Sequence, residues 1–169
     1  MKQLFQLLTI AALGVLGGTQ SAWAATATNT FDVTITVQPS CAFTAPSTIS
    51  ALDFGSAVAS TATNGATTAT GSTTFNMQCT IGTAPVISLS SANGWKMVGI
   101  DSTPYDNTAA TIAYTLSSDS AGSTAWNTTM TVTALSDGSD QTFTVYGAVA
   151  DTGKTVGNFK DTVTVTLTY

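Results

Sequence analysis

Apolar and polar residues alternate with a period of two through most of the chain after residue 25. Gly, Asn, Asp, Ser and Pro separate the alternating segments, as expected for short β-strands joined by turns. No helical period persists for ten residues in this part. The pattern predicts an all-β sandwich in which one face of each sheet is buried. The expected strand segments are 31–37, 73–79, 86–89, 112–116, 130–134, 143–149 and 163–169. Residues 56–71 and 117–124 are predicted loops, because they consist almost entirely of small and polar turn residues.

The chain has very few charged residues, which restricts the chemistry available to it. Only 8% of its residues are charged, and it contains no His, Arg or Glu. Nucleic-acid binding lacks the cations that neutralise phosphates, and metal sites or a Ser–His–Asp triad lack their usual His. Asp137 and Asp140 are loop acids without the supporting residues that a glycosidase needs. We therefore predict no catalytic residue, no metal, no cofactor and no nucleic-acid partner.

The first two dozen residues have the features of a secretory signal peptide. Lys2 precedes an apolar run over 7–16, and Ala22-Trp23-Ala24 has the form of a cleavage site. The apolar run is too short to span a membrane. We expect residues 1–24 to be a signal peptide, 25–38 an N-terminal extension and 39–169 one sandwich domain, exported and not embedded in a membrane.

Cys41 and Cys79 are the two cysteines of the chain. An even count in an exported protein predicts a disulfide between them. A redox pair or a metal site would require closely spaced cysteines or His partners, and neither is present. Closing this loop would stabilise the domain by about 4 kcal/mol in the chain-entropy model.

The two ends of the predicted domain suggest a polymer. Phe31, Val33, Ile35 and Val37 share one face of a first strand, and Gln38-Pro39-Ser40 follows it. The strand over 162–169 runs to the last residue, and an exposed strand edge invites pairing with another chain. One subunit's N-terminal strand would then complete its neighbour, as in donor-strand complementation. The residues alone also allow an ordinary first strand that turns back at 38–40, and an internal strand at 163–169.

The C-terminal segment 157–169, GNFKDTVTVTLTY, closely resembles the signature of spore coat protein U domains. Those domains are subunits of archaic (Csu-type) chaperone–usher pili. Further matches occur in the same order along the chain, so the resemblance covers nearly all of it after residue 25. They are Leu52-Asp53-Phe54-Gly55, Cys79 with Gly82-Thr83, Tyr114-Thr115-Leu116 with Asp119, Trp126, and Val145-Tyr146-Gly147.

The resemblance implies an immunoglobulin-like β-sandwich that lacks its final strand. It implies that Phe31, Val33, Ile35 and Val37 are donor-strand residues, and that Val163, Val165, Leu167 and Tyr169 border the acceptor groove. The implied partners are a periplasmic chaperone, an outer-membrane usher and neighbouring pilus subunits. The implied location is the surface of a Gram-negative bacterium, reached through the periplasm, with a role in adhesion and biofilm formation.

Two other readings compete with a pilus subunit. A monomeric carbohydrate-binding sandwich would use a surface aromatic, for which Trp95 beside Gly94 is the better candidate. Buried packing is the more common role of large aromatics, Trp126 included. A coat protein that does not polymerise would share the fold.

Overall fold

The computed structural model describes residues 25–45, 48–61, 63, 65–104, 106–126, 129–132, 135 and 137–169. The chain divides after Thr36, so that 37–169 form one compact unit and the described residues 25–36 belong to another. The predicted signal peptide, residues 1–24, lies outside the described residues. No helix in the described ranges is long and apolar enough to cross a membrane.

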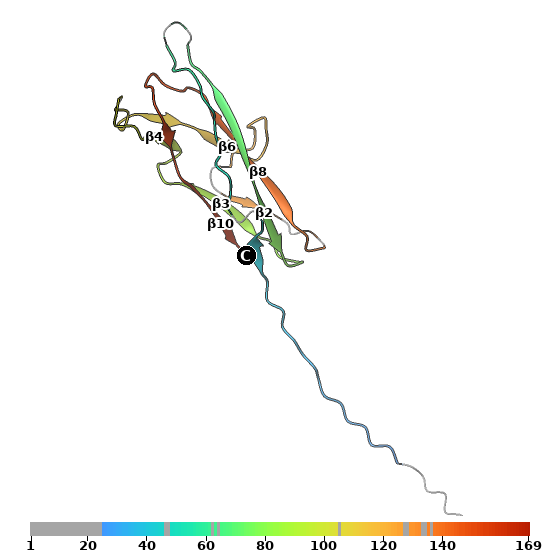
Figure 1. Ribbon diagram of the computed structural model, residues 1–169. Helices are drawn as coiled ribbons and strands as arrows, with labels where there is room; N and C mark the ends of the chain where they lie inside the picture. Colours follow the sequence, from blue (N-terminus) through green and yellow to red (C-terminus); the bar gives the residue numbers. More distant parts are fainter. Residues whose placement is uncertain are drawn as a thin grey trace, which may run out of the picture. The chain divides into compact units, whose positions relative to one another are not determined.

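The regular secondary structure of the described residues consists of β-strands, with no helix, which confirms the all-β prediction (Figure 1). The strands are β1 (Cys41–Phe43), β2 (Ala69–Cys79), β3 (Val86–Ser91), β4 (Lys96–Gly99), β5 (Thr111–Ala113), β6 (Thr115–Ser117), β7 (Thr129–Thr131), β8 (Gln141–Val149), β9 (Phe159–Lys160) and β10 (Val163–Thr168).

The strands form three antiparallel sheets. The largest has the order β1-β2-β8-β6, and its two long central strands pair from Ala69↔Val149 to Met77↔Gln141. The other two sheets have the orders β10-β3-β7 and β5-β4-β9. The two ends of β2 lie at opposite ends of the sandwich. We call the end with the pair Ala69↔Val149 the apical end, and the end with the pair Cys41↔Cys79 the basal end.

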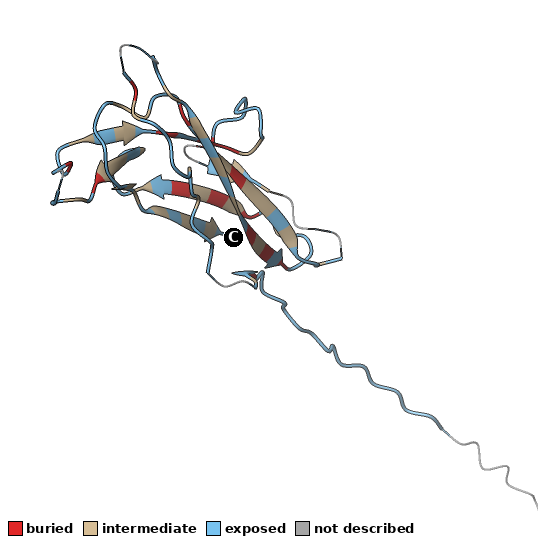
Figure 2. Ribbon diagram, turned by 45° about the horizontal axis from the view of Figure 1, so that its top comes forward, coloured by how far each residue is buried: buried red, intermediate tan, exposed pale blue. Residues whose placement is uncertain are grey.

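The core lies between the long sheet and the other two sheets. Alternate residues of β2, β3 and β8 are buried, in stretches that Figure 2 shows in red. Phe75 is the aromatic centre of this core, since its ring lies 5.5 Å from Phe143, 5.7 Å from Phe43 and 6.0 Å from Trp126. The alternation of apolar and polar residues in the sequence therefore predicted correctly which face of these strands is buried.

The observed strands differ from the predicted ones in their bounds and number. The predicted loop over 56–71 is wrong at its end, because β2 already begins at Ala69. Threonine, serine and glycine continue the pairing with β8 there, although they carry little apolar signal. The short strands β1, β4 and β9 were not anticipated as strands. The segment 31–37 has no regular secondary structure.

A pair of glycines makes room for a chain segment to cross the inner face of the long sheet. Gly71 of β2 lies directly opposite Gly147 of β8. A Cβ atom on Gly147 would lie 2.9 Å from both Leu52 and Phe54, and one on Gly71 would lie 2.3 Å from the carbonyl oxygen of Asp53. The segment around Asp53 can therefore approach the sheet only where two facing residues lack side chains.

We predict that Gly147→Ala destabilises the domain by about 1–3 kcal/mol, because the added methyl group overpacks against Leu52 and Phe54. Equilibrium unfolding in guanidinium chloride measures this loss. Ala148→Ser, which changes the exposed neighbour on the opposite face, should leave the free energy of unfolding unchanged. An unaltered midpoint for Gly147→Ala would show that the segment does not pack as described.

Candidate strand-binding interface

The last strand has one free edge. β10 pairs with β3 along its whole length, from Val163↔Ser91 to Thr168↔Val86. Within the described part of the chain, no second strand pairs with β10. Its other row of backbone N–H and C=O groups is therefore available to an additional strand.

The side chains of β10 show that the core is only partly covered at this edge. Val163, Val165 and Leu167 pack against the core but are only half-buried, while the threonines between them are exposed. By contrast, Ile87 and Leu89 of the adjacent β3 are buried. Tyr169, the fourth predicted groove residue, follows the strand and is exposed. Three of the four predicted edge residues thus form one inward-facing row.

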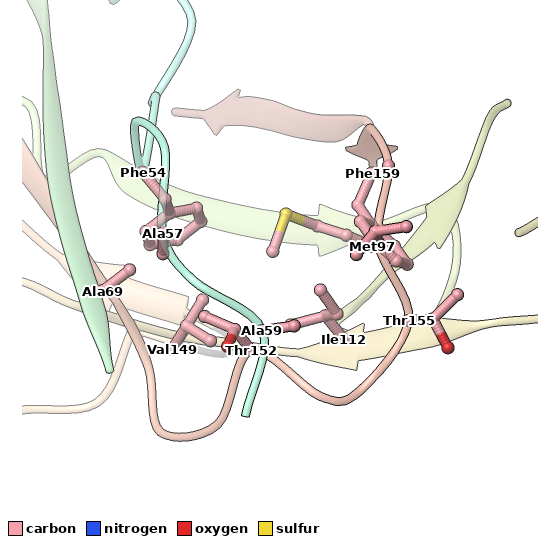
Figure 3. A pocket seen from close by; sticks show the side chains of 12 residues that line it. Phe54, Ala57, Ala59, Ala69, Met97, Ile112, Val149, Thr152, Thr155 and Phe159 are labelled. Carbon is pink, nitrogen blue, oxygen red and sulfur yellow. The ribbon is translucent and has the colours of Figure 1, made fainter. Parts of the chain in front are cut away.

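An apolar cavity of about 180 Å³ opens at the apical end. Figure 3 shows Phe54, Met97, Ile112, Val149 and Phe159 around it. Ala57 and Ala59 from the segment after Phe54 also line it, and the hydroxyl-bearing Thr152 and Thr155 are the polar members of a mostly apolar wall. The cavity lies beside β9, the strand that precedes β10, and can accept an apolar side chain.

Asp161 fixes the point at which the chain passes from β9 to β10. Its carboxylate accepts hydrogen bonds from the hydroxyls of Ser91 (2.5 Å) and Tyr114 (2.6 Å) and from the amide Nδ2 of Asn93 (2.8 Å). It also accepts a bond from the backbone N–H of Thr162 (2.8 Å). Donors from three separate parts of the chain therefore hold the start of the free edge strand in place.

These contacts shift the acidity of both partners. Partial burial by itself would raise the pKa of the Asp161 carboxyl, but the hydrogen bonds from Ser91, Tyr114, Thr162 and Asn93 outweigh it and hold that pKa below its usual value. Burial, and then the hydrogen bond to Asp161, raise the pKa of the Tyr114 hydroxyl well above its usual value. The Tyr114 hydroxyl therefore stays protonated at physiological pH and donates a hydrogen bond to Asp161.

A second network holds the loop before β9. Asn107 is buried, and its Oδ1 accepts a bond from the backbone N–H of Asp101 (2.8 Å), while its Nδ2 donates to the carbonyl of Asn158 (3.1 Å). The Asp101 carboxylate accepts bonds from the backbone and side chain of Asn158. Gly157 permits this approach, because a Cβ atom there would lie 2.4 Å from Asn107 Nδ2.

The predicted donor residues carry their side chains in solvent. Phe31, Val33, Ile35 and Val37 are between 77% and 88% exposed. Such a row of apolar side chains is unusual on a soluble protein unless a partner covers it. The predicted disulfide between Cys41 and Cys79 forms, and it joins β1 to the end of β2.

The two tryptophans have packing roles. Trp126 is buried, as expected for a core aromatic. Trp95 is half-buried, and its ring meets Tyr114 edge-on at 6.1 Å between ring centroids. Its backbone is left-handed, with φ of 64°, and the Ser91 hydroxyl accepts a hydrogen bond from its N–H (2.7 Å). The ring considered as a sugar-binding platform is therefore packed against the buried Tyr114.

Two further aspartates, Asp119 and Asp137, cap turns. Asp119 accepts backbone bonds from Ala121, Ser123 and Thr124, and the bonds from Ser123 and Thr124 lower its pKa to about 2. Asp137 likewise accepts a bond from the N–H of Ser139. No cluster of three or more metal-ligating side chains occurs among the described residues.

The sequence patterns did not reveal the roles of Asp101 and Asn107 in anchoring β9, or that of Asp161 at the start of β10. The one available signal was the position of Asp161 within the C-terminal segment, directly before the alternating residues 163–169. Its partners Ser91, Asn93 and Tyr114 are far away in sequence, so their convergence required the fold.

We predict that Asp161→Asn lowers the free energy of unfolding by about 1.5–3 kcal/mol at pH 7, because hydrogen bonds to a charged acceptor are lost. The folded state lowers the pKa of Asp161, so its contribution is complete above the unfolded pKa of about 3.9 and is lost as the pH falls through the folded value. Denaturant titrations at pH 7, 4 and 2.5 test this. The difference between wild type and Asp161→Asn should shrink toward acid pH, whereas Asp140→Asn, at an exposed carboxylate, should differ little from wild type at pH 7. A constant difference would contradict the assignment.

The family model of the Spore Coat Protein U domain matches residues 27–166. No curated protein matches the chain. The similar solved structures include a CsuC-CsuE chaperone–tip adhesion subunit pre-assembly complex from archaic chaperone-usher Csu pili of Acinetobacter baumannii, at 19% identity and a TM-score of 0.49. The match covers 79% of this chain but only 40% of that chain, and a likeness this distant establishes no function.

Proposed function

The chain belongs to the Spore Coat Protein U domain family, and we propose that it is a structural subunit of an archaic chaperone–usher pilus that polymerises by donor-strand complementation. The observation that carries this proposal is the free edge of β10 above a half-buried apolar row. The likeness of residues 157–169 to the C-terminal signature of pilus subunits supports the same conclusion.

The donor would be the exposed segment 31–37 of a second copy. Six residue steps from Phe31 to Val37 span about 20 Å in an extended strand, which matches the length of β10 at about 17 Å. Period-two spacing would direct the four apolar side chains into the groove and the polar ones between them outward. Both strands have the same repeat, so their inward side chains can interleave.

The energetics require a groove that already exists. Burying four large apolar side chains contributes about 6–12 kcal/mol gross, whereas ordering seven residues costs about 7–14 kcal/mol. Ladder hydrogen bonds, at about 0.5–1.5 kcal/mol each, must then decide the balance. Complementation is favourable only if the acceptor domain is folded beforehand. A periplasmic chaperone would meet this condition if it kept the groove folded. At the outer-membrane usher, the next subunit would then replace the chaperone.

The connection to the next domain favours an antiparallel donor. In every copy, Cys41 lies at the basal end, and so does the C-terminal end of β10, because Thr168 pairs with Val86 just after the Thr80–Thr83 turn. A donor antiparallel to β10 runs from the basal end toward the apical end, so the basal end of the next copy follows it on the apical side and the chain of copies can grow. A parallel donor would bring all basal ends together and prevent growth.

The proposed location and role follow from assembly at the outer membrane. Such a fibre would extend from the surface of a Gram-negative cell and serve adhesion and biofilm formation. The alternative of a monomeric carbohydrate-binding domain has less support, because Trp95 packs on Tyr114. The alternative of a coat protein that does not polymerise by strand exchange requires a direct test.

We predict that Ile35→Asp abolishes polymerisation, because a carboxylate cannot be buried in the groove without a partner. Co-expression with the chaperone and usher, followed by gel electrophoresis without boiling, measures the ladder of polymers. Thr34→Asp alters the outward face and should retain the ladder. Because residues 34 and 35 are both exposed in the free chain, neither change should affect folding of the domain.

Deleting residues 25–37 separates the pilus subunit from the non-polymerising coat protein. A pilus subunit without its donor segment should still bind the chaperone but add no further subunit. A wild-type chain that remains monomeric at every concentration, with chaperone and usher present, would overturn the proposal.

A further inference from the structure

We propose that the disulfide Cys41–Cys79 carries the tension of the fibre from the donor segment of each copy to the sheet that holds the next donor. The chain between the two cysteines then bears no tension. We call the disulfide, residues 79–85, β3 and β10 the tension route. This inference rests on the proposed donor-strand polymer, and it gives the disulfide a mechanical role in addition to stabilising the fold.

Tension must enter each copy at Cys41. A fibre that attaches a cell to a surface is pulled whenever the cell moves. In the proposed polymer, segment 31–37 of one copy is held in the groove of its neighbour, and residues 38–40 alone connect it to Cys41. This linker extends to at most about 14 Å between the Cα atoms of Val37 and Cys41. It becomes taut as soon as the fibre is stretched, and the pull reaches the first residue of β1.

Tension must leave each copy through β10. The next donor strand would pair with the free edge of β10. The opposite edge of β10 pairs with β3 along the whole strand, from Val163↔Ser91 to Thr168↔Val86. A pull on one copy therefore acts between Cys41 and the pair of strands β3 and β10. The bonds that join these two points decide which part of the domain is loaded.

β1 by itself is a weak joint between them. It pairs with β2 at three positions, and it is the edge strand of its sheet within the described residues. Single hydrogen bonds join the segment after β1 to β2: the N–H of Thr44 to the Asn76 carbonyl (3.0 Å), Asn76 Nδ2 to the Ala45 carbonyl (3.1 Å) and the Thr73 hydroxyl to the Ser50 carbonyl (2.7 Å). Each such bond contributes little by itself. A pull carried by β1 would slide this segment along β2.

The disulfide bypasses this joint. Cys41 lies directly opposite Cys79, the last residue of β2, and the bond between them closes a separation of 38 residues. Two hydrogen bonds flank it on the linker side: the N–H of Ser40 donates to the Thr80 hydroxyl (3.1 Å), and the N–H of Thr80 donates to the Ser40 carbonyl (2.9 Å). A covalent bond persists at forces that separate hydrogen bonds. The pull therefore passes from Cys41 to Cys79 before β1 can move.

The connection from Cys79 to β3 is short and well held. Residues 80–85 alone separate β2 from β3. The N–H of Thr83 donates to the Thr80 carbonyl (3.2 Å) within this connection. Pro85 is buried, and its carbonyl accepts a hydrogen bond from the N–H of Val132 (2.9 Å). β3 then transmits the pull to β10 through their ladder of backbone bonds, so the apical end of β2 stays outside the tension route.

Stretching single polymers at constant force tests this role. The double variant Cys41→Ala with Cys79→Ala lacks the disulfide, and its polymers should lengthen and break about tenfold sooner than wild-type polymers, because hydrogen bonds alone then hold β1. The matched control is Gly147→Ala, which lowers the stability of the domain at its apical end and keeps the disulfide. Its polymers should have the wild-type lifetime under force, although its unfolding midpoint falls.

Asn76→Ala tests the tension route in a chain that keeps the disulfide. It deletes the hydrogen bond to the Ala45 carbonyl, which lies outside the tension route. In the wild-type background this change should leave the lifetime under force unchanged. In the background without the disulfide it should shorten the lifetime further, by about threefold. The same bond is lost in both backgrounds, so the contrast reports where tension runs and not how stable the domain is.

The outcomes separate the two proposals. If the wild-type chain forms no polymer, donor-strand polymerisation is refuted and the tension route with it. If polymers form, equal lifetimes with and without the disulfide refute the tension route alone. A shortened lifetime for Asn76→Ala in the chain that keeps the disulfide refutes it as well, and this measurement decides the question even if the chain without the disulfide does not fold. Lifetimes that follow the unfolding midpoints across all variants would show that the disulfide acts only through stability.

Discussion

The unpaired edge of β10 is the feature on which the rest of this molecule depends. Val163, Val165 and Leu167 face the core but stay half-buried, while the backbone groups along their outer edge have no strand beside them within the described chain. A sandwich in this state exposes both apolar surface and hydrogen-bonding groups, and an added strand satisfies both at once. The exposed apolar row 31–37 has the complementary pattern.

An incomplete sandwich needs other means of holding its edge in place. Asp161 collects hydrogen bonds from Ser91, Asn93 and Tyr114 where β9 passes into β10, and Asn107 ties the preceding loop to Asp101 and Asn158. The disulfide Cys41–Cys79 joins β1 to β2 at the other end. Polar networks of this kind are directional, and therefore they fix geometry at an edge where close packing is incomplete. The hydrogen bonds to Asp161 thus hold the start of β10, which has a strand on one side only among the described residues.

Several parts of the fold were predictable from sequence, because their information is local. Alternation of buried and exposed residues in β2, β8 and β10 follows directly from the period of two in a strand. The short strands β4 and β9 were missed, since two to four residues carry too little periodicity and a left-handed Trp95 precedes β4. The start of β2 was missed because its threonines and serines pair with β8 through backbone bonds that do not depend on apolar side chains.

The sequence by itself determined the all-β class, the cysteine pair and the apolar face of the N-terminal segment. Each of these depends on residue type and on spacing along a few neighbouring residues. The tertiary structure alone decided that β10 pairs on one side only within the described residues, and that Gly71 faces Gly147 beneath Phe54. Those facts depend on contacts between residues distant in sequence, and such contacts are set by how the sheets pack together and not by any local pattern.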